Sequence, residues 1–271
     1  MKQITVVVAE KPHKIENGTV LYQLRDSVKP GADIVVLNGV PVVEDCVLKD
    51  GDSVVFIRRG EIPGPNELEA LMMARHTPGV HEVIRRSSVG IAGLGGLGSA
   101  VAISLARMGV GKLILVDFDV VEPSNLNRQQ YFIDQIGMLK TDALAETLAR
   151  VNPHTRVEKH CVRVSREEAC SLFENVQIVV EAFDHEASKA MLVEALLKGH
   201  RKIMIVAASG MAGYASANAV RTEKFGQRLY ICGDRCTSCE PGCGLMAPRV
   251  GVTAQHQANA VVRLLLGEYE A

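Results

Sequence analysis

The residues best placed to bind a phosphorylated ligand are closely spaced glycines that follow an apolar stretch at residues 89–92. Gly93, Gly95 and Gly98 form the pattern G-x-G-x-x-G, with Gly96 inside it. In a strand–turn–helix unit, the first glycine permits a tight turn, the second lets the backbone approach a phosphate, and the third lets the helix pack closely on the strand. The free amides at the start of that helix favour an anion. These glycines therefore predict a nucleotide-binding turn.

Two carboxylates follow the next predicted strand. Residues 112–116 are apolar after a leading lysine, and Asp117 and Asp119 come directly after them. They lie about 20 residues beyond the glycines, where an acidic side chain holds ribose hydroxyls in dinucleotide-binding folds. Both aspartates are therefore predicted to belong to the site. Nicotinamide-dependent oxidoreductases share this half of the pattern and form one alternative.

Side chains that donate hydrogen bonds follow the aspartates: Asn125, Asn127, Arg128 and, after a short gap, Lys140. Arg presents a planar fork of donors and Lys a point charge, and both favour phosphate oxygens. This group of donors predicts a site for a triphosphate, and a plain solvated loop is the alternative. No His/Lys or Tyr/Lys pair stands at a recognisable catalytic spacing, which makes an oxidoreductase the weaker interpretation.

The elements around these residues predict an α/β fold with a Rossmann-like, mainly parallel sheet and helices on both faces. The nearly continuous apolar run at residues 176–183 is typical of a buried parallel strand. Asp184 lies at its carboxyl end, the edge at which open α/β sheets bind ligands. We predict a ligand-binding role for Asp184, and capping of the helix predicted at residues 187–197 is compatible with it.

Together these motifs resemble those of a known family. The stretches G-x-G-G-L-G-S, D-x-D, S-N-L-x-R-Q and G-x-x-K are similar to those of the ThiF/MoeB-type adenylyltransferases of the ubiquitin-activating-enzyme-like superfamily, over residues 75–267. The resemblance implies a homodimer that uses ATP to adenylylate the C-terminal glycine carboxylate of a sulfur-carrier protein ending in Gly-Gly, releasing pyrophosphate. A sulfur donor then forms the thiocarboxylate. The motifs are most similar to the ThiF branch, which acts on ThiS in thiamine biosynthesis, and a molybdopterin-type carrier is the alternative.

The resemblance also implies roles for single residues. Arg128, Lys140 and Asp184 are implied to be catalytic, with Asp184 helping to bind Mg²⁺ together with ATP. Arg75 is the positional match to an arginine that enters the partner subunit's ATP site. The chain departs from the family twice: Ala-Arg-His-Thr-Pro stands where Arg-Tyr-Ser-Arg-Gln is usual, and His185 stands where Asn usually follows the aspartate. These departures leave a non-catalytic, nucleotide-binding scaffold as a further alternative.

The first 62 residues predict a separate β-grasp domain. Ile34–Leu37 and residues 40–43 flank Asn38-Gly39, a strong hairpin signal, and strands are also predicted at residues 4–9 and at Ser53–Ile57. A turn is predicted at residues 10–14 and a helix at residues 19–27. This part resembles ThiS. We therefore divide the chain into a ThiS-like domain (1–62), a helical linker (63–88) and an ATP-binding adenylyltransferase domain (89–271).

The ThiS-like domain departs from a carrier in one decisive respect. A carrier needs a free C-terminal Gly-Gly carboxylate, whereas Gly60 is followed directly by Glu61 and the rest of the chain. A peptide-bonded glycine has no carboxylate to activate. We expect a fused, carrier-like domain with a structural or docking role, and a latent carrier released by cleavage is the alternative.

Four cysteines lie close together in the sequence. Cys232, Cys236, Cys239 and Cys243 form the pattern C-x3-C-x2-C-x3-C. Four thiolates can hold a tetrahedral Zn²⁺, but structural zinc sites usually join two pairs across a longer insert. Three interpretations stay open: a site for zinc or another thiophilic metal, a sulfur-relay or carrier-linking thiol, and ordinary loop cysteines.

Composition narrows the class of protein. The 271 residues carry a formal net charge of −1, so nothing indicates binding to nucleic acid or to a membrane surface. No apolar run reaches the length of a membrane span, and the first residues show no signal-peptide pattern. Seven cysteines, an odd number, argue against a secreted disulfide scaffold. We expect a cytoplasmic enzyme.

Overall fold

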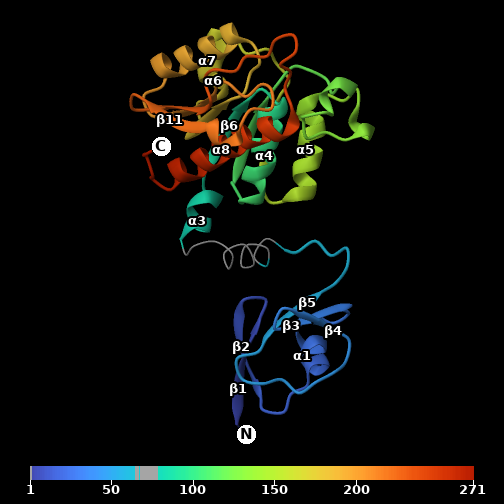
Figure 1. Ribbon diagram of the computed structural model, residues 1–271. Helices are drawn as coiled ribbons and strands as arrows, with labels where there is room; N and C mark the ends of the chain where they lie inside the picture. The colour runs from blue at the N-terminus through green and yellow to red at the C-terminus, as the bar shows by residue number, and fades with distance from the viewer. Residues whose placement is uncertain (1, 65–66, 68–78) are drawn as a thin grey trace. The chain divides into compact units, whose positions relative to one another are not determined.

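The computed structural model describes residues 2–64, 67 and 79–271. The chain divides into two compact units, Met1–Pro78 and Gly79–Ala271 (Figure 1). The first contains the predicted β-grasp domain and the second the predicted nucleotide-binding domain.

The first unit is a five-stranded sheet in the order β2-β1-β5-β3-β4, with one helix packed on it. β1 and β5 pair in parallel at the centre, β2 pairs antiparallel with β1, and β3 pairs antiparallel with both β4 and β5. This arrangement confirms the predicted β-grasp fold. Its elements are β1 (Gln3–Val8), β2 (Lys11–Glu16), α1 (Leu21–Val28), β3 (Ile34–Leu37), β4 (Val40–Val42) and β5 (Ser53–Ile57).

The turns of this unit show where the sequence was informative and where it was not. Asn38 and Gly39 have φ values of 51° and 82°, and positive φ at both central residues is what a two-residue type I′ hairpin requires. The turn predicted at residues 10–14 is wrong. The turn is at Ala9 and Glu10, both with positive φ, and β2 follows as an edge strand. Its charged side chains and proline suggested a turn, but an edge strand tolerates both.

The second unit is a seven-stranded sheet in the order β11-β12-β10-β9-β6-β7-β8. All its strands are parallel except β11, which runs antiparallel to β12. The strands are β6 (Ser88–Ala92), β7 (Lys112–Val116), β8 (Arg156–His160), β9 (Ile178–Glu181), β10 (Met204–Ala208), β11 (Arg221–Phe225) and β12 (Leu229–Gly233). The α/β fold with a mainly parallel sheet is thereby confirmed.

Helices cover both faces of this sheet (Figure 1). They are α3 (Val80–Arg85), α4 (Gly96–Arg107), α5 (Lys140–Val151), α6 (Arg166–Leu172), α7 (Glu186–Gly199) and α8 (Ala247–Leu265), with short 3-10 turns η1 (Pro123–Asn125), η2 (Ile133–Gln135) and η3 (Ala217–Ala219). One apolar cluster joins the sheet to α4, α5 and α8, and a second joins it to α6 and α7.

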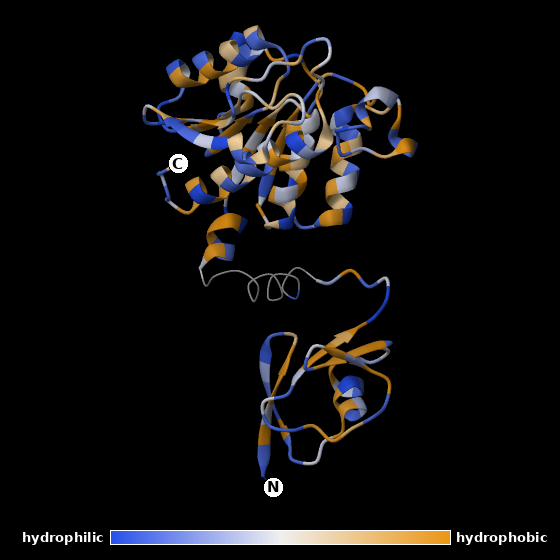
Figure 2. Cartoon of the chain, in the orientation of Figure 1, coloured by the Kyte–Doolittle hydropathy of each residue, from blue (hydrophilic) through white to orange (hydrophobic). Residues whose placement is uncertain are grey.

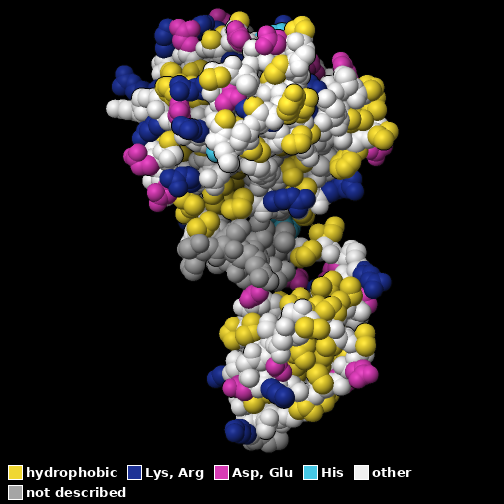
Figure 3. Space-filling model, viewed as in Figure 1, with side chains coloured by type: hydrophobic (Ala, Val, Ile, Leu, Met, Phe, Trp, Pro, Cys, Tyr) yellow, Lys and Arg dark blue, Asp and Glu magenta, His cyan; other side chains and the backbone are white. Residues whose placement is uncertain are grey.

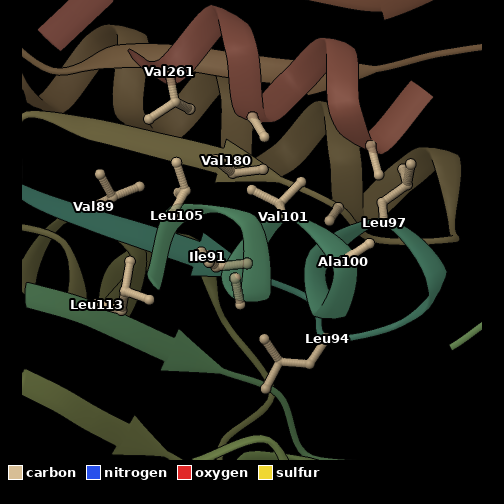
Figure 4. Packing of buried hydrophobic residues seen from close by; sticks show 14 of the residues in the cluster. Val89, Ile91, Leu94, Leu97, Ala100, Val101, Leu105, Leu113, Val180 and Val261 are labelled. Atoms are coloured by element: carbon tan, nitrogen blue, oxygen red, sulfur yellow. The ribbon is translucent and has the colours of Figure 1, made fainter. Parts of the chain in front are cut away.

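Helices α4 and α8 pack with β6 in one apolar layer. Figure 4 shows Val101 and Leu105 of α4 between Ile91 of β6 and Val261 of α8. All four side chains are fully buried. Fully burying an aliphatic side chain of this size contributes about 1.5–3 kcal/mol, so this layer holds α4 firmly against the sheet.

The strand order reverses between β6 and β9. From β6 the chain proceeds to β7 and β8 on one side, and then to β9, β10 and β12 on the other. The carboxyl ends of β6 and β9 therefore flank the point at which the order reverses, where open α/β sheets bind ligands. The predicted glycine turn follows β6, and the Asp184 loop follows β9.

The hairpin of β11 and β12 was not predicted, because β11 is an exposed edge strand with charged residues and shows no apolar alternation. Among the helices that the structure describes, none is long and apolar enough to cross a membrane.

Candidate active site

Backbone geometry explains why two of the predicted positions, Gly93 and Gly98, require glycine. Gly93 has a φ of 90°, and a Cβ there would lie 2.7 Å from the carbonyl oxygen of Ala182. A Cβ at Gly98 would lie 1.8 Å from the carbonyl oxygen of Gly93. The first glycine permits the turn beside the exit of β9, and the third lets α4 approach the turn, as the spacing predicted.

The other two glycines differ in what surrounds them. Gly95 is the N-cap residue of α4 and has no side chain to accept from the first-turn amides, so these point towards any anion at the helix start. A Cβ at Gly96 would lie 2.8 Å from Cγ1 of Val250 and 3.4 Å from Cγ of Arg128. Gly96 therefore makes room for α8 and for the stem of Arg128.

The two predicted ribose carboxylates have different roles in this structure. Asp117 is buried, and its two carboxylate oxygens accept from the amides of Leu94, at 2.6 Å, and of Asp119, at 2.8 Å. The hydroxyl of Tyr131 donates to the carbonyl of Leu94 at 2.8 Å. Asp117 and Tyr131 thus hold both sides of the residue after Gly93. Sequence reasoning assigned Asp117 to the ligand and missed Tyr131.

Asp119 is the carboxylate that remains accessible. Its side chain is 48% exposed and forms an ion pair of 3.0 Å with Lys140, whose own side chain is only 7% exposed. Lys140 is the first residue of α5, and its amide donates to the carbonyl of Asp119 at 2.9 Å. The structure thus brings two of the predicted site residues, Asp119 and Lys140, together at the carboxyl end of β7. Burial and the nearby charges of Asp117 and Asp119 raise the pKa of Tyr131, which keeps its hydroxyl a donor.

The loop around η1 brings Arg128 to the start of α4 but uses its asparagines internally. The Asn125 side chain is buried and accepts from the amide of Glu122 at 3.1 Å. The Asn127 side chain accepts from Arg128 at 2.8 Å. Gln129 is buried beside Gly95, and its side-chain oxygen is a buried acceptor without a partner in the described structure. Gln129 was noted in the motif but was not among the predicted site residues.

Asp184 is exposed beyond the carboxyl end of β9. The structure places His185, and not Asp184, at the N-cap of α7, so the capping alternative for Asp184 is wrong. The preceding Phe183 lies against the glycine turn, since a Cβ on Gly93 would be 3.1 Å from its ring. The Asp184 loop and the glycine turn are thus neighbours. Arg75 lies outside the described residues, and its role stays a prediction.

The four cysteines do not form a metal site in this structure. Cys232 is fully buried in β12, where burial raises the pKa of its thiol to about 11. Cys236 and Cys239 are exposed and Cys243 is half-buried, in the loop after the strand. Among the described residues, no group of three or more His, Cys, Asp or Glu side chains could hold a metal ion. The zinc interpretation does not fit these residues, because the strand carries the first cysteine into the core.

A buried ion pair fixes the cysteine loop at the edge of the sheet that carries the glycine turn. Asp234 follows β12 and pairs with Arg249 in the first turn of α8. Burial would raise the pKa of Asp234, but the amides of Thr237 and Cys236, with Arg249, hold that pKa below its ordinary value. The exposed thiols therefore extend from a firmly anchored base.

A cavity of about 1030 Å³ in the second unit is at the opposite edge of the sheet. Its lining includes α3 and the residues that lead into β9 and β10. Because it lies at the amino ends of these strands, it is separate from the glycine turn and Asp184.

Comparison with known proteins agrees with this geometry. The family model described as the ThiF family matches residues 69–271, and the model described as ThiS-like ubiquitin matches residues 4–60. This chain belongs to the ThiF family. Molybdopterin-synthase adenylyltransferase of Escherichia coli (strain K12) is 32% identical over 192 residues, which are 69% of this chain and 76% of that protein.

Other relatives extend the comparison. Adenylyltransferase and sulfurtransferase UBA4 of Saccharomyces cerevisiae (strain ATCC 204508 / S288c) is 28% identical over 208 residues, covering 73% of this ThiF-family chain and 46% of that protein. The enzyme class predicted from the sequence, an adenylyltransferase, is confirmed by these relatives. E. coli tRNA N6-threonylcarbamoyladenosine dehydratase, TcdA, solved in complex with ATP, superposes with a TM-score of 0.66 at 20% identity, over 73% of this chain and 93% of that one. That likeness shows the fold.

Proposed function

We propose that this ThiF-family protein uses ATP to adenylylate the C-terminal glycine carboxylate of a small ubiquitin-like sulfur carrier, in the service of thiamine biosynthesis. The observation that carries the proposal is the convergence of cationic and amide donors at one end of the sheet. Arg128 lies beside Gly96 at the start of α4, and Lys140 lies beside Asp119. These donors lie at the carboxyl ends of β6 and β7.

The charges suggest how such a site would work. A carrier carboxylate is already ionised near neutral pH, so the reaction needs no strong general base. The enzyme must bring two anions together, align the carboxylate with the α-phosphorus and stabilise the charge on pyrophosphate, which is positioning plus electrostatics. In this proposal the amides of α4, Arg128 and Lys140 bind phosphate oxygens, and Asp119 binds the ribose.

A magnesium ion fits beside Asp184. Mg²⁺ is usually bound through one or two carboxylates together with substrate phosphates, and it keeps several waters. Asp184 is an exposed carboxylate without a capping role, at the same end of the sheet as the glycine turn. When bound, the ion would neutralise phosphate charge. We therefore propose ATP with Mg²⁺ as the cofactor set and no structural zinc.

The fused domain supports thiamine as the process served. A ThiS-like domain precedes the catalytic unit, and ThiS is the carrier of that process. Gly60 is peptide-bonded, so the domain itself offers no carboxylate. Hydrophobic side chains gather over β3, β4 and β5 in Figure 3, and Val40, Val43 and Val47 are 56–90% exposed. This surface favours a docking role. The E. coli relative is named for molybdopterin synthase, which keeps a molybdopterin-type carrier as the alternative.

An exposed apolar strip supports a homodimer. Phe132, Ile133, Ile136 and Leu139 are 36–79% exposed around η2, in the loop beside α5, and this loop includes hydrophobic stretches in Figure 2. Exposed apolar patches of this kind mark protein interfaces. We propose that a second copy covers the strip and supplies Arg75 to the site. A cytoplasmic location accompanies this proposal.

Two exposed cysteines are candidates for the transfer of sulfur to the carrier. Cys236 and Cys239 extend from the loop after β12, at the carboxyl edge of the sheet. A sulfur-relay or carrier-linking role for one of them is compatible with their exposure, and the sulfur donor would be a separate protein.

The test is exchange of labelled pyrophosphate into ATP, with Mg²⁺ and with ThiS-type or molybdopterin-type carriers that end in Gly-Gly. Exchange that needs a ThiS-type carrier, and is lost when its last glycine is removed, supports the proposal. Exchange only with the molybdopterin-type carrier would change the process served. ATP binding without exchange with either carrier would instead indicate the non-catalytic scaffold.

A further inference from the structure

An ion pair between a buried carboxylate and a half-buried lysine adjoins the Asp184 loop. Glu181 is the last residue of β9, and its side chain is 1% exposed. Lys189, on α7, places its ammonium group 3.0 Å from the Glu181 carboxylate. The sequence showed Glu181 only as the end of an apolar strand, and the proposed mechanism assigns no task to either residue.

Both members of the pair hold the same residue, Phe183. The amide of Phe183 donates to Glu181 Oε1 at 2.8 Å, and Lys189 Nζ donates to the carbonyl of Phe183 at 2.8 Å. That carbonyl belongs to the peptide group that joins Phe183 to Asp184. The pair therefore fixes the orientation of the peptide from which Asp184 projects.

The same residue couples this loop to the glycine turn. A Cβ on Gly93 would lie 3.1 Å from the ring of Phe183 and 2.7 Å from the carbonyl oxygen of Ala182. Because the two segments are in close contact, holding Phe183 also sets how far Asp184 lies from the start of α4. The distance between the Asp184 carboxylate and the bound phosphates would decide whether one Mg²⁺ can contact both.

A buried ion pair is a poor device for stability alone. Desolvating both charges commonly offsets their attraction, and apolar residues of the same size often serve as well. Burial raises the pKa of Glu181, while the charge and hydrogen bond of Lys189 and the amides of Phe183 and Ala208 oppose that rise. A pair that is costly to bury, and of which both members hydrogen-bond the backbone of Phe183, is better explained by the turn that it holds.

We propose that Glu181 and Lys189 are positioning residues that hold the Phe183–Asp184 turn, so that the Asp184 carboxylate meets the magnesium ion of the bound nucleotide. This inference rests on the proposed function. It predicts that the pair acts on the nucleotide through Asp184 alone.

The experiment measures ATP affinity of the full chain by calorimetry, once with Mg²⁺ and once with EDTA. Lys189→Met should reduce the gain in affinity that Mg²⁺ provides by about tenfold, as should Asp184→Asn, and leave the affinity in EDTA within twofold. Lys189→Arg, which keeps the charge and the donors, should restore most of the gain. Lys198→Met is the matched control, because Lys198 is an exposed lysine of the same helix that pairs with Glu194.

The decisive comparison combines the changes. In an Asp184→Asn background, Lys189→Met should cause no further loss of the Mg²⁺ effect, since residues that act through one group are not additive. A full further loss would overturn the proposal and indicate general damage to the site. If Lys189→Met does not fold, Glu181→Gln with Lys189→Met removes the uncompensated charge and gives the same comparison. Wild-type protein that binds Mg²⁺–ATP but shows no carrier-dependent exchange would refute the proposed function and leave this test intact.

Discussion

Gly98→Ala tests the contact between the glycine turn and α4. Gly98 is the third residue of a helix, where alanine is ordinarily better than glycine by about 1 kcal/mol. In this structure, however, the new Cβ would lie 1.8 Å from the carbonyl oxygen of Gly93, and ordinary contact begins at 3.4 Å. The helix and the turn would have to separate by about 1.6 Å, the difference between these two distances.

The clash outweighs the gain in helix propensity. The two atoms nearest to the new Cβ are backbone atoms of Gly93, which the buried layer holds in place. The side chain of Ile91, 3.2 Å away, leaves no room for the Cβ to move aside. Overpacking of this kind costs about 1–3 kcal/mol, or more where nothing can move aside. We expect a net loss of about 2 kcal/mol, a fall in Tm of roughly 4–8 °C for a domain of this size, and at least tenfold weaker ATP binding.

Gly251→Ala is the matched control. Gly251 is also within a helix, α8, and a Cβ there would meet no atom within 4 Å. Because alanine favours the helix more than glycine does, this substitution should stabilise the fold by about 1 kcal/mol and raise Tm by roughly 2–4 °C. Thermal scans and calorimetric titration with ATP measure both variants. If Gly98→Ala were as stable as Gly251→Ala and bound ATP normally, the inferred contact between Gly98 and Gly93 would be wrong.

Three further outcomes follow from the site. Arg128→Ala should lower carrier-dependent pyrophosphate exchange by about 10²–10³-fold with little change in Tm, because its guanidinium hydrogen-bonds only Ser124 and Asn127 of its own loop; a large fall in Tm would contradict this. Asp117→Asn should destabilise the fold by about 1–3 kcal/mol in urea titrations, since one buried carboxylate oxygen becomes a donor facing the amide of Asp119; Asp119→Asn should weaken nucleotide binding instead. Burial raises the pKa of Cys232 from 9.0 to about 11. The unfolded chain thus loses this proton first, and stabilisation present below pH 9 disappears as the pH approaches 11. Relative to Cys232→Ala, the wild type should lose up to about 3 kcal/mol over that interval.

The parts of the fold set by local spacing were predictable. The glycine turn, the Asn38-Gly39 hairpin and the buried strand β9 follow from backbone conformations and apolar runs within a few residues. Arg128 and Lys140 were also selected from the sequence, since their types suit phosphate oxygens, and their role in binding phosphate stays a prediction.

What the sequence could not show depends on contacts between distant residues. Asp117 and Asp119 are two positions apart and equivalent in pattern, but only Asp117 meets the amide of Leu94, 23 residues earlier. Cys232 looks like the first of four loop cysteines until its pairing with β10 places it in a buried strand. Likewise, the sequence did not show that Lys189 pairs with Glu181, eight residues earlier and across a turn.

The candidate site separates the exposed side chains proposed to bind the nucleotide from the groups that hold the backbone. Asp119 and Asp184 are exposed, while the backbone near them is held by buried or half-buried groups. Asp117 and Tyr131 hold Leu94, and Glu181 and Lys189 hold Phe183. Exposed side chains can reorient when a nucleotide enters, but a turn anchored at both its amide and its carbonyl cannot. Substitutions of the exposed residues should therefore reduce activity without loss of stability, and substitutions of the buried ones should reduce both, because the second group fixes where the first begins.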